Sequence, residues 1–331
     1  MPLTLRGATP ADIDPMATLL HEDARARQRR DPALWRLADD ARQRIVQALT
    51  RALGPGDQPV RQAWWIAEDG ARLAGLAHAM HLPVPPIYAG RFGEPGLLLA
   101  DGALAAGAPP DTGARLRAAA EAGLREAGAS LLLSATLPGG AGQAALARAG
   151  YVPLTLYLTK SGLETAAPAG VRAATEADVP AITTLSAANR ATLAALDPFW
   201  VPHPEADARF AAWMTRSLTL TDRDMRVAGT GPAMTGYVIA QPATPLHFPA
   251  AHDFSGIGVI DDYYATEFAD PAALSGSGGS AAALLQAAEA ACAGRGRDTA
   301  LVVCPAAWHS KIALLEQAGY APGLIWMIKR G

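Results

Sequence analysis

The chain contains one segment that is written twice. The first copy opens with Arg6, Thr9 and Asp12 in the pattern Arg-x-Ala-Thr-x-x-Asp, and the same pattern returns from Arg172 to Asp178. Each matched pair is separated by 166 residues (172 − 6, 175 − 9 and 178 − 12). A constant offset over several positions indicates an internal duplication, which restricts the fold to two copies of one unit.

The two copies also end alike. Gly150-Tyr151 and Gly319-Tyr320 each follow a helical stretch and precede a final apolar strand. Between the opening and closing motifs, apolar spacing and turn signals predict the order β-α-α-β-β-β-α-β-α-β in both copies. We therefore predict an α/β fold of two tandem domains, residues 1–163 and 168–331, each a mixed β-sheet flanked by helices.

Composition narrows the class of protein. The 331 residues are 50% hydrophobic, which suffices for two cores, and the net charge is −3 with a pI near 6.2. This balance offers no basic surface for nucleic acid or anionic lipid. The two cysteines exclude a disulfide framework, and no apolar run is long enough to span a bilayer. We expect a cytoplasmic monomer or homodimer.

The opening motif, the element order and the closing Ala-Gly-Tyr together resemble the GNAT acyltransferase superfamily over nearly the whole chain. This resemblance implies tandem GNAT-like domains that use acetyl-CoA or another acyl-CoA as co-substrate. It also implies that the fourth strand of a copy and the helix after it bind the CoA. At such a turn, unpaired amides and the helix dipole favour the pyrophosphate, and glycine allows its close approach.

The second copy carries a glycine-rich turn at the corresponding place. By the resemblance, the CoA-binding residues are those of the turn together with the end of the fourth strand and the start of a later helix: Tyr264, Ala265, Thr266, Gly276, Ser277, Gly278, Gly279, Ser280, Ala281 and His309. Gly276 stands where the family usually has Gln or Arg, so the departure affects a side-chain contact. A flexible linker has the same composition as this turn, and a solvated histidine at a helix start explains His309 equally simply.

The corresponding turn of the first copy is degenerate. Asp111 places a carboxylate where phosphate would bind, and Pro109 and Pro110 remove two amide donors. We therefore expect the first domain to be structural and to close one side of the substrate cleft. A frame error of one or two residues is the alternative, since Gly113 could serve as the first glycine of the turn.

The fourth strand of the second copy suggests the catalytic base. Asp261 and Asp262 are adjacent acids in an apolar strand, where side chains alternate between faces, so one of them should face the cleft. Our preference is Asp262, and Glu267 is the substitute if neither acts. Asp101 is the corresponding acid of the first copy.

The general acid that the resemblance implies, a tyrosine, has no counterpart in either copy. The family's tyrosine is replaced by Leu315, and by Leu146 in the first copy. Either Tyr263 or Tyr264 would then protonate the leaving thiolate, or the thiolate leaves unassisted.

Aromatic residues in the segment before the hairpin suggest a substrate pocket. Trp200 and His203 lie among prolines, which exclude regular structure there, and Trp35 is the first-copy equivalent. No spacing typical of a metal site is present.

Together these features predict an N-acyltransferase that moves an acetyl or other short acyl group to the amine of a small molecule. The alternatives are a catalytically idle acyl-CoA-binding or scaffold protein, and an aminoacyl-tRNA-dependent transferase. The acidic pI argues against the last.

Overall fold

The computed structural model describes residues 3–56, 60–246 and 248–331. The first half contains β1 (Thr4–Gly7), η1 (Pro10–Asp12), α1 (Ile13–Arg30), α2 (Ala41–Leu53), β2 (Gln62–Asp69), β3 (Arg72–His81), β4 (Gly96–Leu98), β5 (Ala103–Leu104), α3 (Thr112–Glu126), β6 (Leu131–Thr136), α4 (Ala141–Arg148) and β7 (Val152–Ser161). The second half contains β8 (Val171–Ala173), η2 (Glu176–Asp178), α5 (Val179–Leu196), η3 (Pro198–Trp200), α6 (Ala206–Ser217), β9 (Asp224–Ala228), η4 (Gly231–Ala233), β10 (Gly236–Pro242), β11 (Ile257–Ala265), η5 (Thr266–Phe268), α7 (Gly279–Gly294), β12 (Thr299–Pro305), α8 (His309–Gln317) and β13 (Ala321–Arg330). The predicted mixed α/β class is confirmed.

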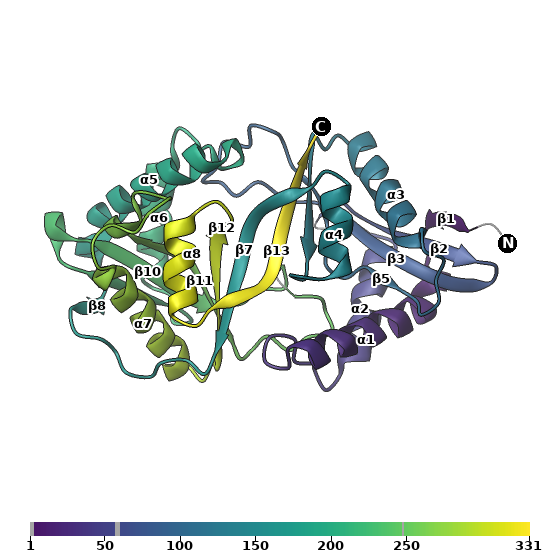
Figure 1. Cartoon of the computed structure of the whole chain (residues 1–331), viewed down its shortest axis with the longest axis horizontal. Coiled ribbons are helices and arrows are strands. Elements are labelled where there is room, and N and C mark those ends of the chain that lie inside the picture. The colour runs from purple at the N-terminus through teal and green to yellow at the C-terminus, as the bar shows by residue number, and fades with distance from the viewer. Residues whose placement is uncertain (1–2, 57–59, 247) are drawn as a thin grey trace.

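The two halves share one sheet because they exchange their closing strands. The described strands form a 13-stranded sheet in the order β1-β2-β3-β4-β6-β13-β7-β12-β11-β10-β9-β8, with β5 paired to β3. The last strand of the second half, β13, thus lies between β6 and β7, while β7 pairs with β12 of the second half (Figure 1). The limits 1–163 and 168–331 stay a prediction, since this exchange crosses them.

The repeated opening motif builds the same local structure in both halves. Arg6 Nη2 lies 2.8 Å from Asp12 Oδ1, and Arg172 Nη2 lies 2.7 Å from Asp178 Oδ1. Each aspartate also accepts the backbone N–H of its threonine, which caps η1 or η2. The guanidinium lowers the pKa of both carboxyls well below their usual range. The motif therefore fixes the entry into the first helix of each half and carries no catalytic chemistry.

The closing motif ends a helix in each half. Gly150 and Gly319 adopt φ values of +88° and +89°, which favour glycine. The N–H of Tyr151 then donates to Leu146 O, and the N–H of Tyr320 to Leu315 O. Both closing strands begin directly after these tyrosines, as predicted.

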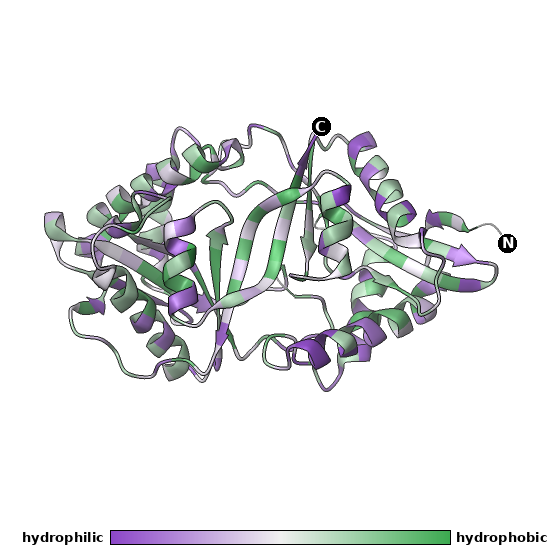
Figure 2. Ribbon diagram, viewed as in Figure 1, coloured by the Kyte–Doolittle hydropathy of each residue, from purple (hydrophilic) through white to green (hydrophobic). Residues whose placement is uncertain are grey.

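Helices lie on both sides of the sheet, α1 and α2 opposite α3 in the first half (Figure 1). Hydrophobic residues follow the central strands, whereas α1 is largely hydrophilic (Figure 2). A Cβ at Gly236 would lie 2.6 Å from Leu284 of α7, and one at Gly75 would lie 3.0 Å from Leu116 of α3. Glycine is thus needed where each long helix packs on the third strand of its half. No helix in the described ranges combines the length and the apolar character needed to span a bilayer.

Candidate functional site

Each half has a bulge in its fourth strand, and the acidic residues lie in these bulges. In the second half, Asp261 and Asp262 stand opposite a single residue of β10, because the pairing shifts between Val238 and Ala240. In the first half, the chain leaves β3 after Leu98 and rejoins it at Ala103, and Asp101 lies between them. The parallel pairing to the neighbouring strand, β6 or β12, also stops just before the acids. Such an opening in a sheet is a suitable place for a site.

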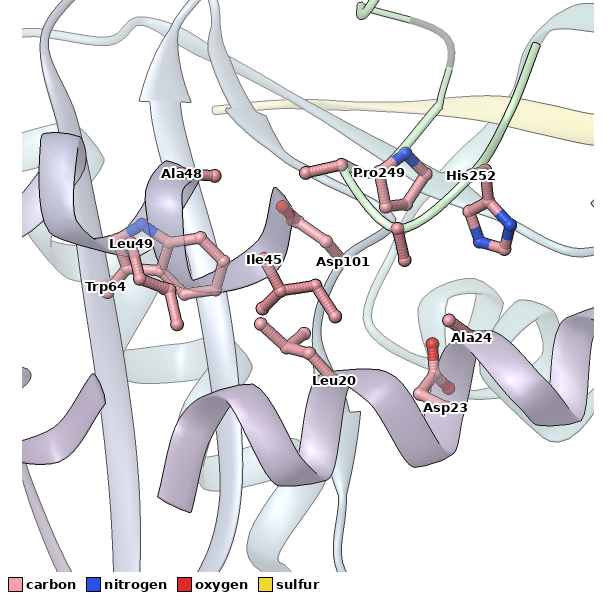
Figure 3. A pocket seen from close by; sticks show the side chains of 12 residues that line it. Leu20, Asp23, Ala24, Ile45, Ala48, Leu49, Trp64, Asp101, Pro249 and His252 are labelled. Carbon is pink, nitrogen blue, oxygen red and sulfur yellow. The ribbon is translucent and has the colours of Figure 1, made fainter. Parts of the chain in front are cut away.

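The first half contains a cavity of about 360 Å³ beside its bulge, the first-half cavity. Asp101 and His78 line it, with Trp326 of β13 and with Phe248 and Phe254 of the second half. A smaller space of about 30 Å³ also has Asp101 in its wall, and Figure 3 shows how side chains of α1, α2 and β2 surround it. The first-half cavity is large enough for a small molecule. Both halves are needed to form it.

His78 and Asp101 form a hydrogen-bonded pair in this wall. His78 Nδ1 lies 2.9 Å from Asp101 Oδ2, and His78 Nε2 lies 2.9 Å from Gln62 Oε1. The indole of Trp64 stacks on the imidazole with ring centroids 3.9 Å apart. With 9% of its surface exposed, His78 has one fixed orientation, and it holds the Asp101 carboxylate in place.

A segment of the second half, residues 243–246 and 248–256, covers the first-half cavity. Ala38 N donates to Ala251 O at 3.0 Å, and Asp253 N donates to Arg36 O at 2.8 Å. The segment is therefore bound through its backbone to the connection between α1 and α2.

Trp35 lies under this covering segment and is 2% exposed. Its ring makes edge contacts with Phe248 and His252 at centroid distances of 5.4 and 5.2 Å. Burial lowers the pKa of His252 to about 4. The structure thus places Trp35 in the packing between the halves, where it supports the wall of the cavity.

The first half makes the reciprocal crossing over the second half. His203 N donates to Ile87 O, and Ala89 N donates to Val201 O, both at 2.9 Å. The rings of Trp200 and Tyr88 lie 5.5 Å apart. The substrate candidates Trp200 and His203 therefore both lie at this contact between the halves. That the first half closes one side of the substrate cleft stays a prediction.

Asp261 and Asp262 have different surroundings in the second half. Tyr237 Oη donates to Asp262 Oδ1 at 2.8 Å. Burial and the neighbouring Asp261 carboxylate raise the pKa of Asp262 to about 6. The side chain of Asp261 is exposed to solvent, and partial desolvation by the surrounding protein raises its pKa. Because of the bulge, simple alternation does not describe this pair, and Asp261 is the more accessible of the two.

Lys311 fills the opening between β11 and α8. Its Nζ donates to Tyr263 O at 2.7 Å and lies 5.0 and 5.4 Å from the ring centroids of Tyr263 and Trp308. Burial lowers the pKa of Lys311, which is 3% exposed. Trp308, fully buried, donates its indole N–H to Phe268 O. A ligand that reaches the backbone of β11 from this side would have to displace both side chains.

Glu267 caps the N-terminus of α7. Its carboxylate accepts the N–H of Ala281 at 2.7 Å and that of Ser280 at 3.4 Å. These are the amides that the glycine-rich turn was expected to offer to pyrophosphate. CoA binding at Gly276–Ala281 stays a prediction, and it would require the Glu267 carboxylate to move away. As a helix cap, Glu267 is also a poor substitute for the base.

The structure does bring together the other predicted residues of this region. Ser310 Oγ donates to Asp270 O at 2.8 Å, so the start of α8 meets the end of η5. Tyr264 and Ala265 are buried, whereas Thr266, Gly276, Ser277 and His309 are exposed around them. Tyr263, the other acid candidate, is buried and donates its hydroxyl to Ala281 O. Among the described residues, no group of three or more His, Cys, Asp and Glu could hold a metal ion.

Comparison with solved structures identifies the fold. A tandem GNAT protein from the clavulanic acid biosynthesis pathway, without AcCoA, covers 99% of this chain and 98% of its own, with a TM-score of 0.51 and 14% identity. A GCN5-related N-acetyltransferase from Sphaerobacter thermophilus covers 99% of this chain and 95% of its own, with a TM-score of 0.55 and 17% identity. The chain has the tandem GNAT fold. No protein-family model and no curated protein matches it.

The two GNAT units differ at the start of their last helix. With Gly150 matched to Gly319, the offset is 169 (319 − 150), and Trp308 and Lys311 correspond to Gly139 and Gly142. A Cβ at Gly142 would already lie 3.0 Å from Thr136 Oγ1. The first GNAT unit therefore has hydrogen atoms where the second has an indole and a lysine side chain.

Sequence reasoning missed the importance of His78 and of the first-half cavity. His78 alternates with apolar residues in β3 and gave no motif. The available signal was Asp101, which had been matched to Asp261. It lacks the second acid that follows Asp261, and the degenerate turn of the first GNAT unit pointed away from CoA binding there.

Proposed function

We propose that this tandem GNAT protein is an acyl-CoA-dependent N-acyltransferase that moves an acetyl or other short acyl group to the amine of a small molecule. We place the reaction at the first-half cavity. The observation that carries this placement is the position of Asp101, a fourth-strand carboxylate that is held by His78 and lines a cavity of about 360 Å³.

The chemistry requires a neutral amine next to the thioester. In the proposed reaction the amine nitrogen attacks the thioester carbonyl carbon, so that a C–N bond forms and the C–S bond breaks. Asp101 takes the proton that the amine loses, directly or through a water. The CoA thiolate leaves with the electron pair of the C–S bond and is protonated by solvent, because Leu146 replaces the usual tyrosine. Asp101 is then the catalytic residue and His78 a positioning residue.

The first GNAT unit suits the arm of an acyl-CoA better than the second. Gly139, Gly140 and Gly142 carry no side chain at the start of α4, where the second unit has the buried Trp308 and Lys311 at the start of α8. The start of α3 is less suited to phosphate because of Asp111. That carboxylate is 61% exposed and lies 3.8 Å from Arg115 Nη1, and an exposed ion pair of this kind contributes little and opens easily.

The second GNAT unit remains the competing location. There, Asp261 or Asp262 would act as base, CoA would bind at Gly276–Ala281, and Trp200 and His203 would contact the acceptor. A protein that binds acyl-CoA without turnover is the other alternative, favoured by the leucines at positions 146 and 315. In either case we expect a cytoplasmic monomer or homodimer that acts without metal, nucleic acid or membrane.

A screen of small amines with acetyl-CoA, read out by the release of free thiol, tests the activity. The Asp101→Asn and Asp262→Asn variants test its location in the same assay. Loss of thiol release in Asp101→Asn alone supports the first-half cavity, and loss in Asp262→Asn alone moves the site to the second GNAT unit. Tight acetyl-CoA binding with no thiol release for any amine would favour the idle binding protein.

A further inference from the structure

The first-half cavity has a chemically polarised wall. Asp101 and His78 lie at one part of it, and Arg44, Gln47 and Arg51 of α2 line another part. Residues 44, 47 and 51 are three and four positions apart, so they lie on one face of the helix. Two arginines thus line the same space as the proposed base.

From this arrangement we infer that the acceptor is an amino acid or a close analogue, with an apolar body, an amine and a carboxylate. This inference rests on the proposed function, which gives the ligand its amine. The carboxylate and the apolar side chain of the ligand are the new part. Asp101 is the acidic residue among the described lining residues, and it is already bonded to His78. Arg44 is paired with Asp40, which does not line the cavity, and its guanidinium keeps further donors that suit an anionic group on the ligand.

Arg44 is able to bind a carboxylate without leaving its present partner. Its Nε lies 2.6 Å from Asp40 Oδ1, in a pair whose side chains are 43% and 49% exposed. A guanidinium has five N–H donors in a planar fork, and the contact with Asp40 uses one of them. Arg51 lies two turns further along the helix and donates its Nε to Gln47 O. The ligand carboxylate is therefore expected at this end of the cavity.

The rest of the wall is apolar and includes one unpaired donor. Leu97, Phe248 and Phe254 surround the space between the two polar ends. Trp326 also lines it, and its buried indole N–H has no hydrogen-bond partner among the described residues. A buried donor without a partner is costly, and a ligand oxygen would remove that cost. An aromatic or branched side chain between the polar groups fits these surroundings.

Binding can be measured without turnover, which separates this inference from the proposed function. Calorimetric titration of the full chain should compare L-phenylalanine and L-leucine with phenethylamine and isoamylamine, which lack the carboxylate. Because hydrogen bonds to charged groups are stronger than those between neutral groups, loss of the carboxylate should weaken binding by at least about tenfold. Arg44→Ala and Arg51→Ala should reduce this preference for the amino acid.

Arg42→Ala is the matched control. Arg42 lies on the same helix, pairs with Asp14 at 3.0 Å and does not line the first-half cavity. It should leave the preference unchanged. Equal affinity for the amino acids and the decarboxylated amines would overturn the inference, as would the absence of binding to both. Selective binding without thiol release would support the inference and refute the proposed acyl transfer.

Discussion

The carboxylate of Asp101 lies 2.9 Å from Nδ1 of His78, where β4 has already separated from β6. His78 lies in β3 and Asp101 between β4 and β5, and the bulge between Leu98 and Ala103 brings the carboxylate to the cavity wall. In the second half, the corresponding bulge directs Asp262 onto Tyr237. The same backbone feature thus gives a carboxylate beside a cavity in one half and a carboxylate bonded to a buried tyrosine in the other.

Replacing Asp101 should separate catalysis from cofactor binding. Asp101→Asn keeps the size of the side chain and its place beside His78 but removes the base. We expect turnover to fall by ~10²–10⁴-fold while the acetyl-CoA affinity changes little. Steady-state kinetics and calorimetry on the same preparation measure both. Asp261→Asn is the control, and a similar loss in that variant would place the base in the second half.

A lysine at position 142 should reproduce in the first GNAT unit the filled opening of the second. Gly142→Lys is expected to weaken acetyl-CoA binding by about 10–100-fold, because the added side chain would occupy the place proposed for the arm of the CoA. Ala144→Lys, at an exposed position of the same helix, should have no effect. If the Gly142 variant binds acetyl-CoA as tightly as the original protein, the arm of the CoA does not pass this glycine.

The cap on α7 predicts how the glycine-rich turn responds to mutation. Glu267→Ala leaves the amides of Ser280 and Ala281 without their carboxylate and should destabilise the protein by about 0.5–2 kcal/mol in urea unfolding. Gly279→Asp should leave acetyl-CoA binding intact if the first GNAT unit binds the CoA. Abolished binding in the Gly279 variant, with Gly113→Asp unaffected, would show instead that CoA displaces Glu267.

The pKa of Asp262 predicts a pH-dependent stability. Burial raises this pKa from 3.8 to about 6, so between these values the folded protein holds more protons than the unfolded chain. Stability should therefore fall as the pH rises through this window. Asp262→Asn removes this loss, and its Tm at pH 7 should exceed that of the original protein by about 3 °C or more, with the difference vanishing below about pH 4.

Asp253→Asn provides the comparison of opposite sign. Hydrogen bonds from Ser255 lower the pKa of Asp253, so its carboxylate contributes stability above pH 4 that is lost in acid. The Asn variant should melt at a lower temperature than the original protein at pH 7. Relative to the original protein, the Tm of Asp262→Asn should rise between pH 4 and pH 7, whereas that of Asp253→Asn should fall as the pH rises through 3.8 and then stay constant. A less stable Asp262→Asn at pH 7 would contradict this assignment.

The fold could be predicted from the sequence because its strongest signals are local. The Arg6–Asp12 bridge and the glycine at position 150 act within a few residues, so the pattern itself reports the structure. The predicted alternation of Asp261 and Asp262 was wrong in detail, since a bulge adds a residue without any mark in the sequence. The alternation of side chains along a strand does not reveal such an inserted residue.

The candidate site could be predicted only in part because its walls come from distant segments. Residues 243–246 and 248–256 cover a cavity whose wall includes Asp101, and no rule of sequence spacing links the two segments. The sequence around Glu267 and Lys311 does not reveal what their side chains contact. Their roles as helix cap and as filler of the opening depend on contacts that form only in the folded chain.

The exchanged strands also constrain the order of events during synthesis. The first half ends near residue 161, yet β6 has no partner on one edge until residues 321–330 have left the ribosome. Until then, an apolar edge strand remains open for as long as the second half takes to be translated. Unpaired edges are prone to pair with other chains. The nascent protein is therefore expected to depend on chaperones that bind exposed strands until β13 emerges.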